Sequence, residues 1–185
     1  MQLSDGRLWI AERHGQPIEQ FHVSQGSSQD CGPHCVAVAV NFWLGQKKLE
    51  AKTVAREMNR PRLGMGLPPL VIRRIPNWAT FPWGITDMLK AHGLHASWRV
   101  RASEKDLHRA LLEDHIVMPI FGEPLQRQGW KWNGWSHVAI LAGWDPAAET
   151  YWFIDSSHET TPSSRPRDTF LRHWNNMERL LIEAF

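Results

Sequence analysis

The stretch QGSSQDCGPHCVAVAV, residues 25–40, joins a polar segment to an apolar run. Pro33 suits the first turn of a helix and Gly45 suits the position after its last turn, so we expect a helix over residues 33–45. The VAVAV run carries no polar residue, which indicates a buried helix. Two cysteines, a histidine, an aspartate and a glutamine crowd its start. This crowding leaves three alternatives: a metal site, a redox pair or a catalytic nucleophile.

A metal site or a redox pair is the weaker interpretation. Cys31, His34 and Cys35 can share one helix face, because their spacing is i, i+3 and i+4. Structural zinc needs a fourth ligand, which no recognisable spacing supplies, although catalytic zinc needs only three protein ligands. A redox pair usually reads CxxC, whereas the spacing here is CxxxC. We therefore expect no metal and no cofactor, with Cys35 packed as a small buried residue.

Cys31 has the features of a nucleophile. It precedes the expected helix, where free N–H groups and the positive end of the helix dipole stabilise a thiolate. The thiolate is the reactive form of cysteine. Gly32 would let a substrate backbone approach closely. A nucleophile also needs a base, and His34 is a poor candidate because it lies on the same turn as the sulfur.

His137 and Asp155 supply a base and a group that could orient it. His137 opens the apolar run HVAILA, and Asp155 ends the run YWFID. An antiparallel hairpin folded about Pro146 would place the two side chains opposite each other on one face. Opposite residues have Cβ atoms about 4.5–5.5 Å apart, close enough for a carboxylate to hold an imidazole N–H. A slip of register would change this pairing, because the loop length is not fixed by the sequence.

The other patterns predict an α+β domain covering residues 1–185, with helices first and an antiparallel sheet later. We expect an extended arm over residues 1–24, with a turn at Gly15. Irregular loops are expected at residues 60–83 and 158–167. Further helices are expected at Glu50–Met58, Thr86–His92, Ser103 to about Asp114 (capped through Asp106) and Asp168–Asn175. Strands are expected at Ala96–Val100, His115–Phe121, His137–Ala142, Tyr151–Asp155 and Arg179–Phe185.

Composition excludes several classes of protein. The chain has 185 residues, of which 42% are hydrophobic and 22% charged, as in a globular domain. Its formal net charge of +2 is too close to balance to indicate nucleic-acid binding. No apolar run is long enough to span a membrane. The N-terminus lacks the pattern of a secretory signal. A cytoplasmic location, or delivery to a target cell without a signal peptide, is therefore expected.

These residues resemble the papain-like cysteine peptidases of the C39 and C39-like group, which includes peptidases that cleave after double glycine. The similarity lies in a glutamine six residues before the DCGxxC cysteine, the histidine strand ending in GWD, the aspartate after the next strand, and a late FxxxW element. The resemblance implies a papain-like fold. It also implies that Cys31 is the nucleophile, His137 the general base and then acid, and Asp155 the group that orients His137. Gln25 would complete the oxyanion hole. Gly32, Trp135 and Ser136 are expected to contact substrate.

The resemblance implies a stand-alone endopeptidase acting on a protein or peptide, with glycine-rich sites as candidate targets. Residues 60–83 look like an insertion that could cap the cleft or contact a partner. Such a peptidase could be a delivered effector that meets a dedicated inhibitor protein. Two alternatives remain: acyl transfer by a transglutaminase or deamidase on the same constellation, and a non-catalytic binding domain built on the same fold.

Overall fold

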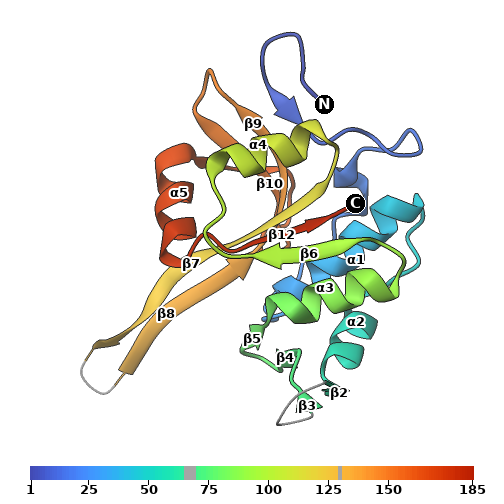
Figure 1. The fold of residues 1–185 in the computed structure, drawn as a ribbon, viewed down its shortest axis with the longest axis vertical. Coiled ribbons are helices and arrows are strands. Elements are labelled where there is room, and N and C mark those ends of the chain that lie inside the picture. Colours follow the sequence, from blue (N-terminus) through green and yellow to red (C-terminus); the bar gives the residue numbers. More distant parts are fainter. Residues whose placement is uncertain (65–69, 129–130) are drawn as a thin grey trace.

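The computed structural model describes residues 1–64, 70–128 and 131–185, and it has the expected α+β architecture. Figure 1 shows α1, α2 and α3 grouped together, while α4 and α5 lie over the sheet. The described helices are α1 (Cys31–Leu44), α2 (Ala51–Met58), α3 (Pro82–Ala91), α4 (Glu104–Leu112), α5 (Arg167–Asn176) and a 3-10 turn at Ile18–Phe21. None of the helices in these ranges is long and apolar enough to cross a bilayer.

The main sheet has the strand order β11-β10-β9-β7-β12-β6, and every pairing in it is antiparallel. Two further strands extend it: β1 pairs with β9, and β8 pairs with β7. The strands of this sheet are β1 (Leu8–Trp9), β6 (Ala96–Arg99), β7 (Ile116–Gln128), β8 (Lys131–Val138), β9 (Ile140–Asp145), β10 (Thr150–Ile154), β11 (Ser163–Pro166) and β12 (Leu181–Ala184).

Helix α1 is the buried helix that the apolar run predicts. Val36, Ala39 and Phe42 are fully buried, and Gly45 ends the helix with a left-handed φ of 64°. The helix begins at Cys31, two residues earlier than expected. Cys31 is therefore the first residue of the helix rather than a residue ahead of it, and its sulfur lies on the first turn.

The other helices agree with expectation apart from their ends. Ser103 and Asp106 form the reciprocal capping box at the start of α4. Helix α3 begins at Pro82, four residues before the expected start at Thr86, because proline is well suited to the first helical position. The main sheet also recruits two segments that were expected to be extended or irregular, since β1 lies in the N-terminal arm and β11 in the polar loop.

The β9–β10 hairpin differs from the expected register. Thr150 pairs with Asp145, and after a bulge between Trp152 and Phe153 the pairing continues as Ile154 with Ile140. When this register is extended by one residue, Asp155 lies opposite residue 139. The expected pairing of Asp155 with His137 was therefore wrong by two residues. A shift of two keeps a side chain on the same face, whereas a shift of one reverses it. The bulge shifts the register by one residue, so that the total difference from the expected register is two residues. His137 and Asp155 therefore remain on one face.

The expected strand over residues 137–142 is divided at Ala139 into β8 and β9. Strand β8 pairs with β7 along a hairpin that projects from the body of the molecule (Figure 1). The turn of this hairpin, residues 129–130, lies outside the described part of the chain. His137 is the second-last residue of β8, so it stands where this hairpin joins the main sheet.

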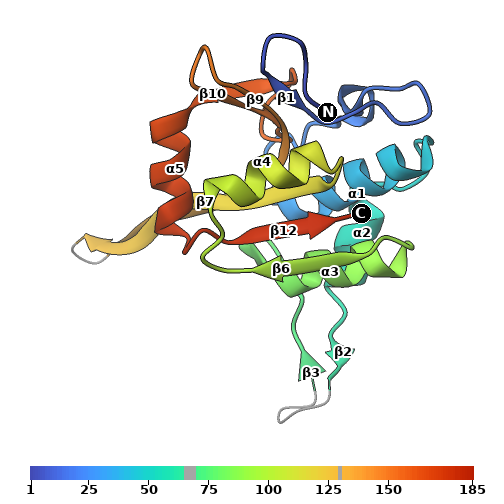
Figure 2. The ribbon, with the colours of Figure 1, turned by 45° about the horizontal axis from the view of Figure 1, so that its top comes forward.

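Residues 60–83 are more ordered than the irregular loop expected there. Their described part forms two short hairpins, β2 (Arg62–Leu63) with β3 (Leu70–Val71), and β4 (Arg74–Ile75) with β5 (Ala79–Thr80). Residues 65–69 of the expected loop lie outside the described residues. Figure 2 shows β2 and β3 projecting away from the helices, while Figure 1 shows β4 and β5 closer to them.

Candidate active site

Cys31 occupies the first position of α1 and is part-buried. Its sulfur lies within hydrogen-bonding reach of the His137 ring and of the backbone at Val138 and Gly32. These four residues come from two elements, because α1 carries Cys31 and Gly32 and the end of β8 carries His137 and Val138. Packing of α1 against β8 therefore brings together groups that are more than a hundred residues apart in sequence.

His137 is held from its other side by Asp155. Nε2 of His137 lies 2.6 Å from Oδ1 of Asp155. Because Nε2 is engaged by the carboxylate, Nδ1 is the ring nitrogen left for the sulfur of Cys31. Asp155 directly follows β10 and is fully buried. The geometry thus forms a continuous chain of thiol, imidazole and carboxylate.

The Asp155 carboxylate is fixed by further donors. Oδ1 accepts the backbone N–H of Ser157 at 2.9 Å and its hydroxyl at 2.6 Å. Oδ2 accepts from Arg165 at 3.3 Å. The Arg165 guanidinium also lies over the ring of Phe121, which packs edge-on against the His137 ring. A buried carboxylate with this many donors is held in one orientation, and it holds the imidazole in turn.

The pKa values of the three groups shift in the directions that favour an ion pair. Burial alone would raise the pKa of Cys31, but the hydrogen bond and charge of His137 outweigh burial and lower it. Burial alone would lower the pKa of His137, but hydrogen bonds to Asp155 and Cys31 raise it to about 9. Burial likewise opposes ionisation of Asp155, yet its bonds with His137 hold the pKa of that carboxyl well below its usual range. Both shifts favour the ionised thiolate and imidazolium, compared with free side chains.

A small cavity of about 20 Å³ lies over Cys31. Such a volume holds about one water molecule. One wall comes from the end of β8 and the other from the β4–β5 hairpin. The lining residues are Gln29, Cys31, Trp78, Ala79, Thr80, Ile120, Ser136, His137 and Val138.

Of the three residues expected to contact substrate, only Ser136 is one of these lining residues. Trp135 packs its ring against Phe121 and His173 instead. Gly32 is not one of the lining residues, and a Cβ at this position would lie 2.6 Å from the side chain of Thr80. The missing side chain at Gly32 thus makes room for the β5 strand, and its contact with a substrate backbone stays a prediction.

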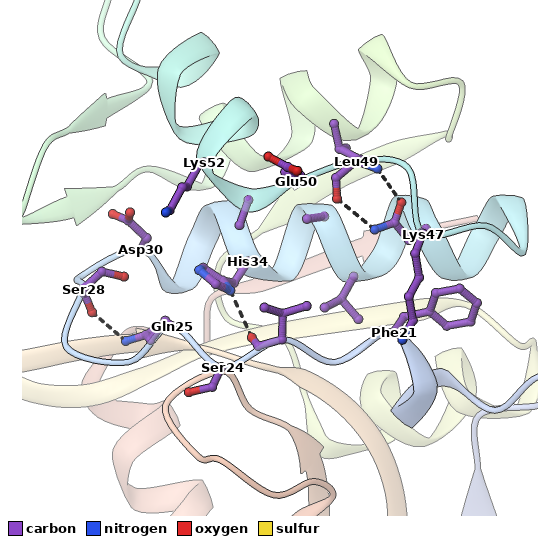
Figure 3. Close-up of a pocket in the computed structure, with 15 residues that line it drawn as sticks. Phe21, Ser24, Gln25, Ser28, Asp30, His34, Lys47, Leu49, Glu50 and Lys52 are labelled. Carbon is purple, nitrogen blue, oxygen red and sulfur yellow. Dashed lines mark hydrogen bonds between the residues drawn. The ribbon is translucent and has the colours of Figure 1, made fainter.

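Gln25 is held beside the helix start by Ser28 and Ser156. Its Nε2 donates to the carbonyl of Ser28 at 3.0 Å, and its Oε1 accepts the hydroxyl of Ser156 at 2.8 Å. An amide nitrogen carries two hydrogens, so one remains for another acceptor. Gln25 lines a second cavity of about 480 Å³ beside α1, which Figure 3 shows. Gln29, which sequence reasoning passed over, lines the cavity at Cys31 instead.

His34 and Cys35 make contacts outside the chain of Cys31, His137 and Asp155. The Nδ1 of His34 bonds the carbonyl of Val23 at 3.0 Å, and the ring lines the second cavity (Figure 3). Cys35 is buried, as expected, and its thiol lies 3.3 Å from the carbonyl of Val138. Burial raises the pKa of the Cys35 thiol well above its ordinary value.

One cluster in the described ranges has the composition of a metal site. Glu113, His115 and Glu183 place one ligand atom each within 4.8 Å of one another. The Glu183 carboxylate already accepts from Arg99, Arg109 and His115 at 2.7–3.0 Å. Two guanidinium groups on one carboxylate oppose a further cation, so this cluster is better described as a structural ion-pair network.

Comparison with known proteins places this geometry in a known fold. No protein-family model matches the chain, and no curated protein matches it. Among solved structures, the chain is similar to a C39-like peptidase from Bacillus anthracis (TM-score 0.64, 15% identity, 96% of each chain covered). It is also similar to a double glycine motif protease from an AMS/PCAT transporter, solved with its leader peptide (TM-score 0.53, 13% identity, 88% of this chain and 89% of that one). The chain therefore has the fold of the C39-like peptidases.

Proposed function

We propose that this protein is a cysteine endopeptidase that hydrolyses a peptide bond through a thioester on Cys31. The observation that carries the proposal is the chain from Cys31 through His137 to Asp155, with the 2.6 Å contact between imidazole and carboxylate. The fold shared with C39-like peptidases supports it. A buried carboxylate, an imidazole and a thiol on three separate elements are the parts that thiol acyl transfer needs.

The proposed reaction has two halves. In the first, the Cys31 thiolate attacks the scissile carbonyl carbon, and the His137 imidazolium gives its proton to the amine as the C–N bond breaks. In the second, neutral His137 takes a proton from water, the resulting hydroxide attacks the thioester, and the acid product leaves the restored thiolate. Asp155 stays ionised throughout and keeps the His137 ring in the orientation that serves both halves.

The oxyanion of each tetrahedral intermediate would form beside the start of α1. The backbone N–H of Cys31 lies at a helix N-terminus, where N–H groups lack partners within the helix. The free hydrogen of the Gln25 amide would be the second donor, with Ser156 fixing the amide oxygen. Removing one such donor typically costs about 10²–10³ in rate.

The substrate is proposed to be a polypeptide with small residues next to the scissile bond. The space over Cys31 is about 20 Å³, which leaves no room for a large side chain beside the thiol. The double glycine motif protease to which the chain is similar was solved with a leader peptide. Cleavage at a glycine-rich site is consistent with both observations.

The proposal is tested by incubating the native protein with a proteome and mapping the new N-termini. The Cys31→Ala variant is the negative control, and Cys35→Ala is the matched control on the same helix. New termini with native and Cys35→Ala protein, absent with Cys31→Ala, would support the peptidase. Ammonia release without chain scission would replace it with deamidation or transglutamination. Absence of any Cys31-dependent product would contradict enzymatic acyl transfer.

A further inference from the structure

The β4–β5 hairpin, residues 74–80, belongs to the insertion between α2 and α3, yet it forms one wall of the cavity over Cys31. Trp78, Ala79 and Thr80 line this wall, facing Ser136 to Val138 on the other side. The two walls come from separate parts of the chain. The position of the hairpin therefore sets the width of the opening above the thiol.

The hairpin is tethered to the residue that precedes the nucleophile. The guanidinium of Arg74 on β4 pairs with the carboxylate of Asp30 and donates to Oδ1 of Asn59 at 2.8 Å. Arg74 is only 5% exposed. A charge buried this deeply is held in place by its partners, because leaving it unpaired is costly. Since Asp30 adjoins Cys31, the tether fixes the hairpin relative to the sulfur.

The hairpin is also seated directly on the first turn of α1. Thr80 on β5 occupies the space that a side chain at Gly32 would take. At the base of the hairpin, the N–H of Phe81 bonds the carbonyl of Arg73 at 3.1 Å, just before α3 begins. The wall is therefore fixed at its base and along β5, and only its turn extends outward.

Trp78 stands at the turn end of this wall. Trp78 lines the cavity, and 64% of the residue is exposed to solvent. A large exposed aromatic residue in the turn of a tethered hairpin is a candidate obstacle at the mouth of the cavity, not a core residue. Truncating it would remove several ring atoms from the opening without leaving a cavity in the core.

We propose that Trp78 is the specificity-determining residue of this site, and that its ring admits only polypeptides with a hydrogen or methyl side chain next to the scissile carbonyl. The residue class of the substrate rests on the proposed peptidase function. The narrowing of the access to Cys31 does not, because it concerns any reagent that reaches the sulfur through this cavity. The two claims can therefore be tested apart.

Access is measured with thiol reagents of different size. Rates of Cys31 alkylation by iodoacetamide and by a bulky N-aryl maleimide are compared in native protein and Trp78→Ala, with Cys31→Ala subtracting reaction elsewhere. Trp98→Ala is the matched control, because Trp98 is 41% exposed on β6, outside the cavity. We expect the maleimide-to-iodoacetamide rate ratio to rise at least about tenfold in Trp78→Ala alone. An unchanged ratio, or an equal rise in Trp98→Ala, overturns the proposal.

Selectivity is measured with peptides that carry glycine, alanine or leucine at each of the two positions before the scissile bond. For native protein, kcat/KM is expected to fall steeply from glycine to leucine, and for Trp78→Ala this ratio should shrink at least about tenfold. Equal selectivity in both proteins would contradict the specificity role. If native protein cleaves nothing, the proposed function fails, while the alkylation ratio still decides whether Trp78 controls access.

Discussion

The two walls of the cavity over Cys31 are built in different ways. The wall with His137 and Asp155 belongs to the main sheet, and its polar groups are buried among core aromatics. The wall with Trp78 and Thr80 belongs to an insertion and is held to the body by the buried pair of Arg74 with Asp30. In the proposed enzyme, the reactive groups lie on α1 and the main sheet, whereas the segment between α2 and α3 would shape the access to them.

The largest expected effect comes from removing His137 on the sheet wall. In His137→Ala the thiol loses the partner that lowers its pKa, and the leaving amine loses its proton donor. We expect turnover to fall on the order of 10⁴-fold. The pKa of Cys31, measured from iodoacetamide rates against pH, should rise. His34→Ala is the matched control, and an equal rise there would show that the sheet wall does not activate the thiol.

A large loss of stability is expected from breaking the tether of the other wall. Arg74→Met leaves the part-buried Asp30 carboxylate, 23% exposed, without its partner, so we expect a loss of about 3 kcal/mol, the lower end for buried pairs. Arg62→Met is the matched control in the same insertion, since Arg62 is an exposed residue paired with Asp87. Exposed pairs contribute at most about 1 kcal/mol. Urea unfolding measures both losses, and similar values would mean that the tether is no stronger than a surface pair.

A smaller loss is expected where the insertion wall meets α1. In Gly32→Ala the new methyl group overlaps Thr80, and overpacking of this kind costs about 1–3 kcal/mol. Thr80→Gly should recover part of that loss when the two changes are combined. The free energies of unfolding of both single variants and the double variant give the coupling. Strict additivity would show that these residues do not press on each other.

The mildest test is the pH dependence of native hydrolysis. The pKa of His137 is raised to about 9, so its imidazolium, with the stabilisation it brings, is fully present below the ordinary value and is lost as pH rises through about 9. We expect kcat/KM to fall about tenfold per pH unit above that point. Asp155→Asn removes the carboxylate that supports the imidazolium, so its alkaline limb should move to lower pH. A native profile still flat at pH 10.5 would contradict the ion pair.

The sequence predicts the wall that carries His137 and Asp155 better than it predicts the wall formed by residues 74–80. An antiparallel hairpin folded about Pro146 indicated that His137 and Asp155 share a face, and the structure brings them together. The register was wrong by two residues, because neither the bulge beside Trp152 nor the break at Ala139 has a signal in local composition. An error of two residues does not change the face on which a side chain lies, because side chains on a strand alternate between its faces with a period of two.

The insertion wall could not be derived in the same way. Arg74 stands in a segment rich in arginine and proline, which is typical of a solvated loop, yet its partner Asp30 lies 44 residues earlier. Gly32 was expected to let a substrate backbone approach closely, and that contact stays a prediction. Thr80, which packs on Gly32, reaches it only through the fold. The contacts of Arg74 with Asp30 and of Thr80 with Gly32 join residues far apart in the sequence. Single contacts of this kind produce no periodic pattern, so they could not be predicted from the sequence.

Arg73 gives the insertion a closed base. Its guanidinium donates to the carbonyls of Glu57 and Arg60, and its own carbonyl accepts the N–H of Phe81. The end of α2 and the start of α3 are thus clasped by a single residue. Substitutions confined to the turn of the β4–β5 hairpin would leave this base, the pair of Arg74 with Asp30 and the contact of Thr80 with Gly32 in place. The access to Cys31 could therefore change in single steps that keep the reactive cysteine.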